Sequence, residues 1–342
     1  MTRKTTFTRT RQVVQVVQVV QVVFGGLCAA ALAWTAVAAH AQDSGKPLRI
    51  VQGFAPGGGH DIVARMLAPR VGTQLGLQPI VDSRPGANGM LAAEHVAKSA
   101  PDGNTVILSG VSTFVLNQLV YAKIAYDTPR DFAAVTIVAA TPQILVAHPG
   151  LPVKSLNDVA ALARRSPNQL TAASPGIGGL SHLTLEIFKR QGKLDIEHVA
   201  YKGTAAALTE VLGGFVPLLI GDMPGPLPHV KAGKLRGLVV TGEKRSAQLP
   251  DVATAREQGY PELQVTNWYG VMAPAGVPPA TITRLHAAFV SAVETPEARE
   301  RYASIGIDPV TSASPAAFAT FVRDEFARWE KVVRSTGIQL QQ

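Results

Sequence analysis

The chain has 342 residues, of which 46% are hydrophobic, and it carries a formal net charge of +8 at pH 7. A chain of this length can bury enough apolar surface to fold without disulfide bonds, and its single cysteine, Cys28, excludes an intramolecular disulfide. The Lys and Arg residues stand singly rather than in clusters interleaved with aromatic residues, which argues against nucleic-acid binding.

The first part of the chain has the pattern of an export signal. Four basic residues precede a long uncharged stretch that ends in an A-x-A pattern at Ala41, which is typical of a secretory signal peptide. We therefore predict a signal peptide over residues 1–41. Its removal takes Lys plus Arg from 32 to 28 against 24 acids, so the net charge falls from +8 to +4. The alternative, a permanent membrane span over residues 12–38, is disfavoured because Gln residues interrupt that stretch.

From Pro47 onward, short apolar runs alternate with helical patterns, which indicates an α/β protein with mostly parallel strands. Pro69 falls inside the first predicted helix and is expected to kink or restart it. The first unit has predicted strands over 48–54, 79–82, 105–109, 133–139 and 143–148, and predicted helices over 61–75 and 91–99.

The second unit repeats this alternation, and the chain then returns to helices only. Its predicted helices lie over 156–165, 180–190 and 205–212, and its predicted strands over 170–173, 198–201, 215–220 and 235–241. A further strand is predicted over 268–274, and the last helix over 315–336 has an amphipathic pattern.

This organisation predicts a two-lobed clamshell in which each lobe is a mixed sheet flanked by helices. We expect residues 42–145 and 268–342 to form the first lobe and residues 146–267 to form the second. A cleft between two such lobes is where small molecules usually bind.

The segment from Phe54 to Asp61 joins the first strand directly to a helix and contains three consecutive glycines. Glycines let the backbone turn tightly and leave amide N–H groups uncovered at a helix N-terminus, where the dipole favours an anion. A carboxylate is the expected occupant. The alternative is a plain strand-to-helix turn in which Asp61 caps the helix.

The segment from Ser174 to His182 repeats this arrangement in the second unit, so two such loops could face each other around the acidic end of a ligand. It is close to G-x-G-x-x-G, but Ser181 stands where the last glycine would be. An exported protein also meets few dinucleotides, and we therefore expect no cofactor.

The same loop is compatible with two other chemistries, hydrolysis and metal binding. Residues 179–183 depart from the G-x-S-x-G nucleophile motif at the last position, although a hydrolase built on Ser181, His182 and Asp222 stays open because triads are defined by geometry. His182 and Glu186 stand four residues apart, which favours a helix surface pair over a metal site. We expect no metal.

Two further residues could line a cleft. Tyr201 stands in a Tyr-Lys-Gly-Thr segment between a predicted strand and a helix. Asp222 follows an apolar strand and could accept a hydrogen bond from a ligand amine or hydroxyl, or it could only begin the turn into Pro224.

Taken together, these motifs resemble those of the Bug/TctC family, the extracytoplasmic solute-binding receptors of tripartite tricarboxylate transport systems. The resemblance covers essentially the whole chain after the signal peptide. It rests on the segments 54–61 with Arg65, 84–89, 101–103, 174–178, 181–183, 201–204, 249–251, 268–270 and 273–276.

The resemblance implies a periplasmic receptor that captures a small organic carboxylate and delivers it to membrane permease subunits. It implies that the receptor is a monomer and is not an enzyme. The alternatives are the hydrolase above and an orphan sensory binding protein. The implied ligand-binding residues, which act largely through backbone amides and water, are Phe54, Ala55, Gly57, Gly58, Asp61, Ser174, Gly178, Ser181, His182, Tyr201 and Asp222.

The sequence departs from the family pattern at His60, where the family usually has a small hydroxyl residue. It also has Asp82 and Ser83 where an acid is usually followed by Asn. If His60 faces the cleft, it could add a hydrogen-bond donor or a positive charge, so the ligand preference of this chain is expected to be its own.

Overall fold

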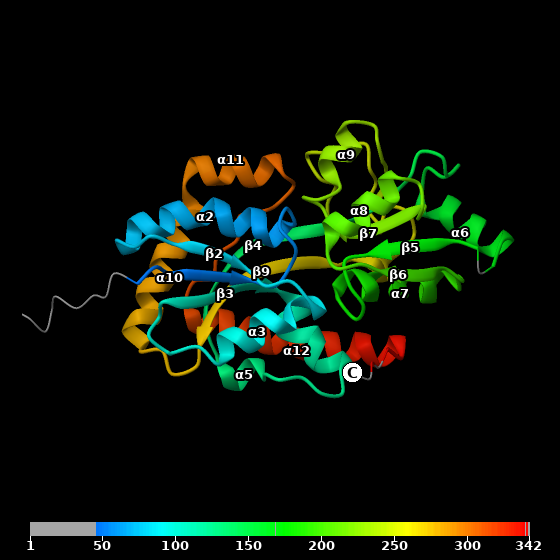
Figure 1. Ribbon diagram of the computed structural model, residues 1–342. Helices are drawn as coiled ribbons and strands as arrows, with labels where there is room; N and C mark the ends of the chain where they lie inside the picture. Colours follow the sequence, from blue (N-terminus) through cyan, green and yellow to red (C-terminus); the bar gives the residue numbers. More distant parts are fainter. Residues whose placement is uncertain (1–45, 168, 339, 341–342) are drawn as a thin grey trace, which may run out of the picture. The chain divides into compact units, whose positions relative to one another are not determined.

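Nine strands of the described residues join in one mixed sheet (Figure 1). The computed structural model describes residues 46–167, 169–338 and 340, so the predicted signal peptide lies outside the described residues. The strands are β1 (Arg49–Gln52), β2 (Ile80–Ser83), β3 (Thr105–Gly110), β4 (Phe132–Ala147), β5 (Thr171–Ser174), β6 (Glu197–Ala200), β7 (Leu218–Asp222), β8 (Arg236–Val240) and β9 (Thr266–Pro274). Their order is β2-β1-β3-β9-β4-β7-β5-β6, with β8 also paired to β4.

The pairing is parallel in the outer parts of the sheet and antiparallel in its middle. β1 pairs in parallel with β2 and β3, and β5 pairs in parallel with β6 and β7. The pairs formed by β9 with β3 and β4, and by β4 with β7 and β8, are antiparallel. The expectation of mostly parallel strands is therefore correct for the outer strands and wrong for the centre.

β4 is one continuous strand where the sequence predicts two, over residues 133–139 and 143–148. Residues 132–142 pair with β9, whereas residues 143–147 pair with β7 and β8. Pro142 has no N–H to donate to a ladder. It lies at the point in β4 where pairing with β9 ends and pairing with β7 and β8 begins. β4 thus runs from the first lobe into the second, and the predicted lobe boundaries at residues 145 and 268 stay a prediction.

The helices include two whose ends the sequence predicts to the residue, α6 and α12. Among the described residues, no helix has the length and apolar character needed to cross a bilayer. The helices are α2 (Gly59–Leu75), α3 (Met90–Ala97), α4 (Asn117–Val120), α5 (Thr128–Asp131), α6 (Leu156–Arg165), α7 (Leu180–Gly192), α8 (Thr204–Leu212), α9 (Leu227–Lys231), α10 (Pro279–Glu294), α11 (Pro296–Ser304) and α12 (Pro315–Thr336).

Pro69 does not restart the first of these helices, because α2 continues through it to Leu75. The hydroxyl of Thr73 donates to the carbonyl oxygen of Pro69 at 3.1 Å. The helix ends at Gly76, whose left-handed backbone is the usual C-terminal stop.

The core lies on both faces of the sheet, as the period-two alternation of strand side chains requires. Ile50 packs with α2 and α10 on one face, whereas its neighbour Val51 packs with α3 and α12 on the other (Figure 1). On that second face the core continues into α6 and α7 of the second lobe. The side chains of α8 and α9 cover the opposite face of the second lobe as a separate cluster.

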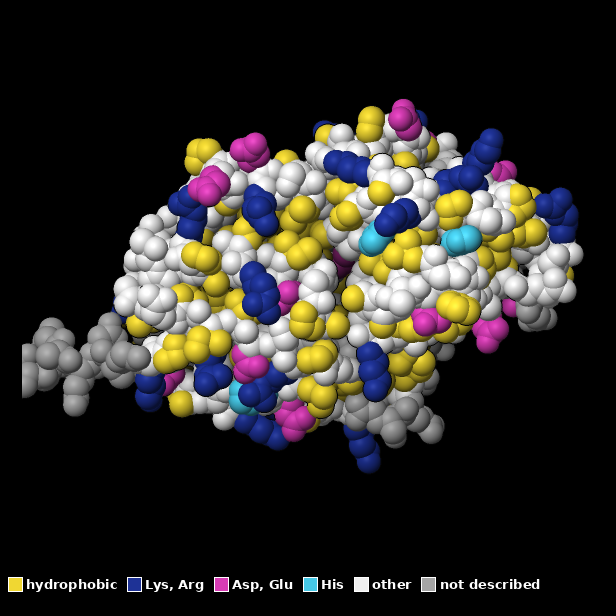
Figure 2. All heavy atoms as spheres, turned by 45° about the horizontal axis from the view of Figure 1, so that its top comes forward, with side chains coloured by type: hydrophobic (Ala, Val, Ile, Leu, Met, Phe, Trp, Pro, Cys, Tyr) yellow, Lys and Arg dark blue, Asp and Glu magenta, His cyan; other side chains and the backbone are white. Residues whose placement is uncertain are grey.

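Figure 2 shows Lys and Arg side chains spread singly over the face that it presents, without one dominant basic patch. On this face, the distribution matches the single placement of Lys and Arg along the sequence.

Candidate functional site: a cavity at the strand ends

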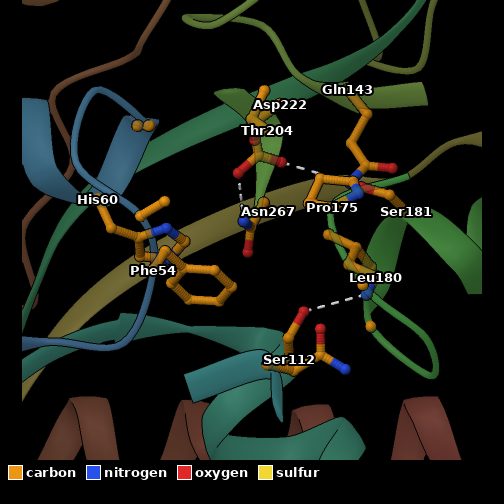
Figure 3. Close-up of a pocket in the computed structure, with 16 residues that line it drawn as sticks. Phe54, His60, Ser112, Gln143, Pro175, Leu180, Ser181, Thr204, Asp222 and Asn267 are labelled. Carbon is orange, nitrogen blue, oxygen red and sulfur yellow. Dashed lines mark hydrogen bonds between the residues drawn. The ribbon is translucent and has the colours of Figure 1, made fainter. Parts of the chain in front are cut away.

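The carboxyl ends of the parallel strands from both lobes point toward one cavity (Figure 3). In α/β sheets, ligands bind outside these ends. The cavity leaves about 40 Å³ for the centres of water-sized molecules, which is room for roughly three waters. Its lining includes Phe54, His60, Ser112, Gln143, Pro175, Leu180, Ser181, Thr204, Asp222 and Asn267.

A second, larger chamber adjoins this inner cavity and shares Phe54, Ala55 and Asn88 with it. It leaves about 220 Å³ by the same measure. Tyr201 and the exposed Lys202 lie in its wall. The site therefore has a small inner cavity and an outer chamber with the cationic side chain of Lys202 in its wall.

The helix α2 begins at the inner cavity without a side-chain cap. Its N-cap is Gly58, and no side chain bonds the open amides there. The first intrahelical bond runs from the amide of Ile62 to the carbonyl oxygen of Gly58 at 3.0 Å. The amides of Gly59, His60 and Asp61 therefore precede the hydrogen-bond ladder, where the helix dipole favours an anion.

Two helices of the second lobe begin at the same cavity. α7 has Gly179 as its N-cap, and α8 has Gly203, again without side-chain caps. The amide of Leu180 donates to the hydroxyl oxygen of Ser112 at 3.0 Å, which leaves the amides of Ser181 and His182 ahead of the α7 ladder. Three helix N-termini thus face one small space, an arrangement suited to an anion.

Asp61 braces the first loop rather than capping α2. One carboxylate oxygen accepts the amide of Gly57 at 3.0 Å, and the other accepts Nε of Arg65 at 2.9 Å. The reading of this segment as a turn capped by Asp61 is therefore not what the structure shows, because the cap position is occupied by Gly58.

His60 lies in an aromatic stack beside the cavity. Its ring centroid is 4.3 Å from that of Phe54 and 4.1 Å from that of Tyr269. Burial lowers the pKa of His60 to about 3, so the imidazole is neutral at pH 7. Of the two contributions left open for His60, the positive charge is thus excluded near neutral pH.

Asp222 is the acidic residue in the inner wall, and three donors fix its carboxyl group. Oδ2 accepts the hydroxyl of Tyr269 at 2.7 Å and Nδ2 of Asn267 at 2.8 Å, and Oδ1 accepts Nε2 of Gln143 at 3.3 Å. Burial raises the pKa of Asp222, while the three hydrogen bonds act in the opposite direction. The residue nevertheless keeps part of its surface exposed toward the cavity.

A pair of histidines braces the second loop from behind. Nδ1 of His182 accepts the amide of Gly178 at 3.0 Å, and the ring of His182 stacks on that of His198 at 3.8 Å. Nε2 of His198 lies 2.6 Å from the hydroxyl of Ser174. Burial lowers the pKa of both histidines, that of His198 to about 3. Both rings are therefore neutral supports.

Direct hydrogen bonds join the two lobes across the cleft. Nδ2 of Asn88 donates to the carbonyl oxygen of Ile177, which also accepts the hydroxyl of Tyr121 at 2.9 Å. Ser112 and Leu180 form a third bridge. The second glycine-rich loop is thus held partly by side chains of the first lobe, which places the cleft in a closed arrangement.

The predicted site residues lie in these two loops, at the end of β7 (Asp222) and after β6 (Tyr201), and they divide into two groups. Phe54, Ala55, Gly58, Ser181 and Asp222 line the inner cavity, and Tyr201 lines the outer chamber. Gly57, Asp61, Ser174, Gly178 and His182 are absent from both linings and support the loops instead. Ligand binding by any of the eleven stays a prediction.

The residues of the hydrolase alternative do not form a connected chain. The hydroxyl oxygen of Ser181 accepts Nε2 of Gln143 at 2.8 Å, and His182 is engaged with the backbone of Gly178. The carboxyl group of Asp222 accepts from the three donors named above, which include neither Ser181 nor His182.

Glu186 is shared between His182, whose Nε2 lies 3.8 Å away, and Lys189, whose Nζ lies 2.6 Å away. Across the described ranges, no three His, Cys, Asp or Glu side chains are gathered as metal ligands would be.

Several lining residues escaped sequence reasoning, above all Gln143 and Asn267. Both are buried amide side chains in strands that are largely apolar, and that contrast is the signal that could have found them. Their proximity to Asp222 follows from sheet register, because Gln143 and Asp222 are direct cross-strand partners. No contrast between a polar residue and an apolar strand marks the other three, which are Asn88, Ser112 and Thr204.

The chain matches the model of one protein family and several known proteins. Residues 63–338 match the family TctC, described as "Tripartite tricarboxylate transporter family receptor". The protein BugT of Bordetella pertussis is 35% identical over 296 residues, covering 86% of this chain and 90% of BugT.

Solved structures show the same fold. Rpa4515 of R. palustris, solved with adipate, has a TM-score of 0.84 and 33% identity, covering 88% of this chain and 100% of that one. MatC of Rhodopseudomonas palustris, solved with bound malate, has a TM-score of 0.79 and 32% identity, covering 84% and 98%. The resemblance inferred from the motifs is confirmed, and so is the two-lobed fold of periplasmic binding proteins. This chain belongs to the TctC family of tripartite tricarboxylate transporter receptors.

Proposed function

We propose that this protein is a periplasmic receptor that captures a small organic carboxylate between its lobes and delivers it to a membrane permease without altering it. One observation carries the proposal. Three uncapped helices, α2, α7 and α8, begin at the wall of one small cavity. Their open amides favour a carboxylate without requiring a cationic side chain.

The solved neighbours support a carboxylate ligand, since one holds adipate and another holds malate. The outer chamber gives a second place for an acidic group, because the exposed Lys202 lies in its wall. A ligand with two carboxylates would then place one among the helix N-termini and the other near Lys202.

The bridges between the lobes support capture by closure. Asn88, Tyr121 and Ser112 of the first lobe bond the loop of the second lobe. A ligand that contacts both loops binds the closed arrangement better than the open one, and it therefore shifts the population toward closure. The permease is expected to recognise this closed form.

The hydrogen bonds of Ser181 favour a receptor over an enzyme. A serine nucleophile requires a base within hydrogen-bonding reach, whereas Ser181 accepts from the amide of Gln143. Export to the periplasm is supported by the predicted signal peptide and by BugD, a solved periplasmic binding protein that is 28% identical.

A thermal-shift screen with mono-, di- and tricarboxylates and amino acids tests the proposal. A ligand at about a hundred times its dissociation constant stabilises the fold by roughly 2.7 kcal/mol, which a melting curve resolves. We expect a shift with one carboxylate class, and full recovery of that ligand by chromatography after incubation. A flat response to the whole panel, with ligand-free protein, would favour the orphan sensory alternative.

The Ser181→Ala variant separates receptor from enzyme. We expect it to bind the same ligand more weakly, because the hydroxyl lies in the cavity wall. Formation of a product by the wild type, abolished in Ser181→Ala, would contradict the receptor and establish the hydrolase.

A further inference from the structure

The inner cavity combines two opposite kinds of wall. One part of it is formed by the beginnings of α2, α7 and α8, which present backbone donors. Its end is formed by Asp222 of β7, which projects toward Asn267 and Gln143 (Figure 3). A ligand that satisfies both walls needs acceptors for the first and a donor for the second.

The carboxyl group of Asp222 has room for one more hydrogen bond. A carboxylate offers about four acceptor positions, and three are taken. Oδ2 accepts from Asn267 and Tyr269, whereas Oδ1 accepts only from Gln143, at 3.3 Å. The remaining position is therefore on Oδ1, in a residue that keeps part of its surface exposed toward the cavity.

The charge of Asp222 has no ionic partner in the part of the chain that the structure describes. Its three partners are two amides and a phenol, and no Lys or Arg lies among the residues lining the inner cavity. A charge removed from water is costly unless it is paired. A ligand that brings an ammonium or hydroxyl hydrogen to Oδ1 removes part of this cost.

We propose that Asp222 makes this receptor select carboxylates that carry an amino or hydroxyl group close to the carboxylate, in preference to the unsubstituted acids. This inference rests on the proposed function and names the ligand class. The small size of the inner cavity, about 40 Å³ for the centres of water-sized molecules, places the donor within one or two carbons of the carboxylate. Amino acids and hydroxy acids have this pattern, whereas saturated diacids do not.

Gln143 acts here as a positioning residue. Its Nε2 bridges the hydroxyl oxygen of Ser181 and Oδ1 of Asp222, at 2.8 and 3.3 Å. This bridge links the beginning of α7 to the acidic end of the cavity. Burial raises the pKa of Asp222, and a ligand cation beside Oδ1 would favour its ionised form.

The test compares ligands that differ in one group only. Isothermal titration calorimetry is performed with succinate, malate and aspartate, and with butyrate, 2-hydroxybutyrate and 2-aminobutyrate. A hydrogen bond to a charged group contributes about 1.5–3 kcal/mol, so at least one donor-bearing member is expected to bind roughly tenfold or more tightly than its unsubstituted partner. The amino and hydroxyl arms identify which donor is preferred.

The Asp222→Asn variant assigns the preference to this side chain. Its preference for the donor-bearing ligand is expected to fall to about threefold or less, since the charged acceptor is gone. Asp195→Asn, at an exposed position of the second lobe, is the matched control and should keep the wild-type ratio. If Asp222→Asn does not fold, the wild-type ligand pairs still show whether the donor-bearing ligands bind more tightly, and the inference fails if they do not.

Two results would overturn the inference. Equal or tighter binding of the unsubstituted acids means that Asp222 does not select a donor, although the carboxylate receptor itself stands. An unchanged ratio in Asp222→Asn assigns the preference to another group. Failure of every carboxylate to bind would instead remove the proposed function and this inference with it.

Discussion

The two glycine-rich loops place the same backbone feature at the cavity but are held by different means. The first, residues 53–59, is braced within its own lobe by Asp61 and by the stack of Phe54, His60 and Tyr269. The second, residues 174–179, is braced by neutral histidines and also by side chains of the opposite lobe.

This difference predicts that the first loop mainly affects the stability of the fold and that the second mainly affects closure of the lobes around a ligand. The bracing of the first loop exists whether or not the lobes meet, so damage there should destabilise the fold. Part of the bracing of the second loop exists only when the lobes meet, so damage there should weaken ligand binding with less effect on the empty protein. The following substitutions test this division.

The largest expected effect comes from Gly59→Ala. A Cβ at Gly59 would lie 2.2 Å from the hydroxyl oxygen of Tyr269, a side chain with 0% exposure that also holds Asp222. Overpacking of a rigid core site costs typically about 1–3 kcal/mol, and we expect the upper end. Thermal or urea unfolding measures the loss.

Gly58→Ala is the matched control for that substitution. A Cβ there has its nearest neighbour, the carbonyl oxygen of Ala55, at 3.4 Å, and the backbone φ of −79° is open to any residue. Equal loss of unfolding free energy in the two variants would show that Tyr269 does not set the requirement for glycine.

The second effect is a pH dependence located in the first loop. The pKa of His60 is 6.5 in the unfolded chain, and burial lowers it to about 3 in the folded protein. Below pH 6.5 the unfolded state therefore binds a proton at His60 that the folded state does not bind. The contribution of His60 to the unfolding free energy is therefore fully present above pH 6.5 and is lost as the pH is lowered. At pH 5 the loss amounts to about 2 kcal/mol.

His60→Asn removes the titrating group. We expect the difference in unfolding free energy between wild type and variant to shift by about 2 kcal/mol between pH 7 and pH 5, as measured by urea denaturation. A difference that stays constant over this range would show that His60 is protonated in the folded protein.

The third effect is on closure. A Cβ on Gly176 would lie 2.2 Å from Oδ1 of Asn88, a residue of the opposite lobe. Gly176→Ala is therefore expected to weaken ligand binding by about tenfold, equivalent to about 1.4 kcal/mol, while the empty protein melts within a few degrees of wild type. A large loss of melting temperature without ligand would contradict the division between the loops.

The smallest expected effect comes from Ser174→Ala. The hydroxyl lies 2.6 Å from Nε2 of His198 and donates to the carbonyl oxygen of Gly176 at 3.0 Å. Its loss should lower the unfolding free energy by about 1 kcal/mol. A loss as large as that of Gly59→Ala would make the second loop the stability determinant instead.

The sequence predicts the elements well where the pattern is local. The helices α6 and α12 have the predicted ends, and both glycine-rich loops precede helices as expected. The sequence divides β4 into two strands because its continuity depends on the strands beside it, and those come from more than 70 residues away in the chain, as Asp222 does for Gln143.

The site was predicted at the loops but not at its acidic end. Gly58 and Ser181 could be found because amide-rich helix beginnings follow from local composition. Gln143, Asn267 and Tyr269 surround Asp222 only through sheet register. The neutrality of His60 depends on burial, to which the distant Tyr269 contributes, and no local pattern reveals that contact.

The most direct test of the account is a crystal structure of the protein with the carboxylate that gives the strongest thermal shift. The account predicts a carboxylate within hydrogen-bonding distance of the amides at the beginnings of α2 and α7, between the closed lobes. A carboxylate bound only near Lys202 in the outer chamber, with the inner cavity left to water, would contradict it.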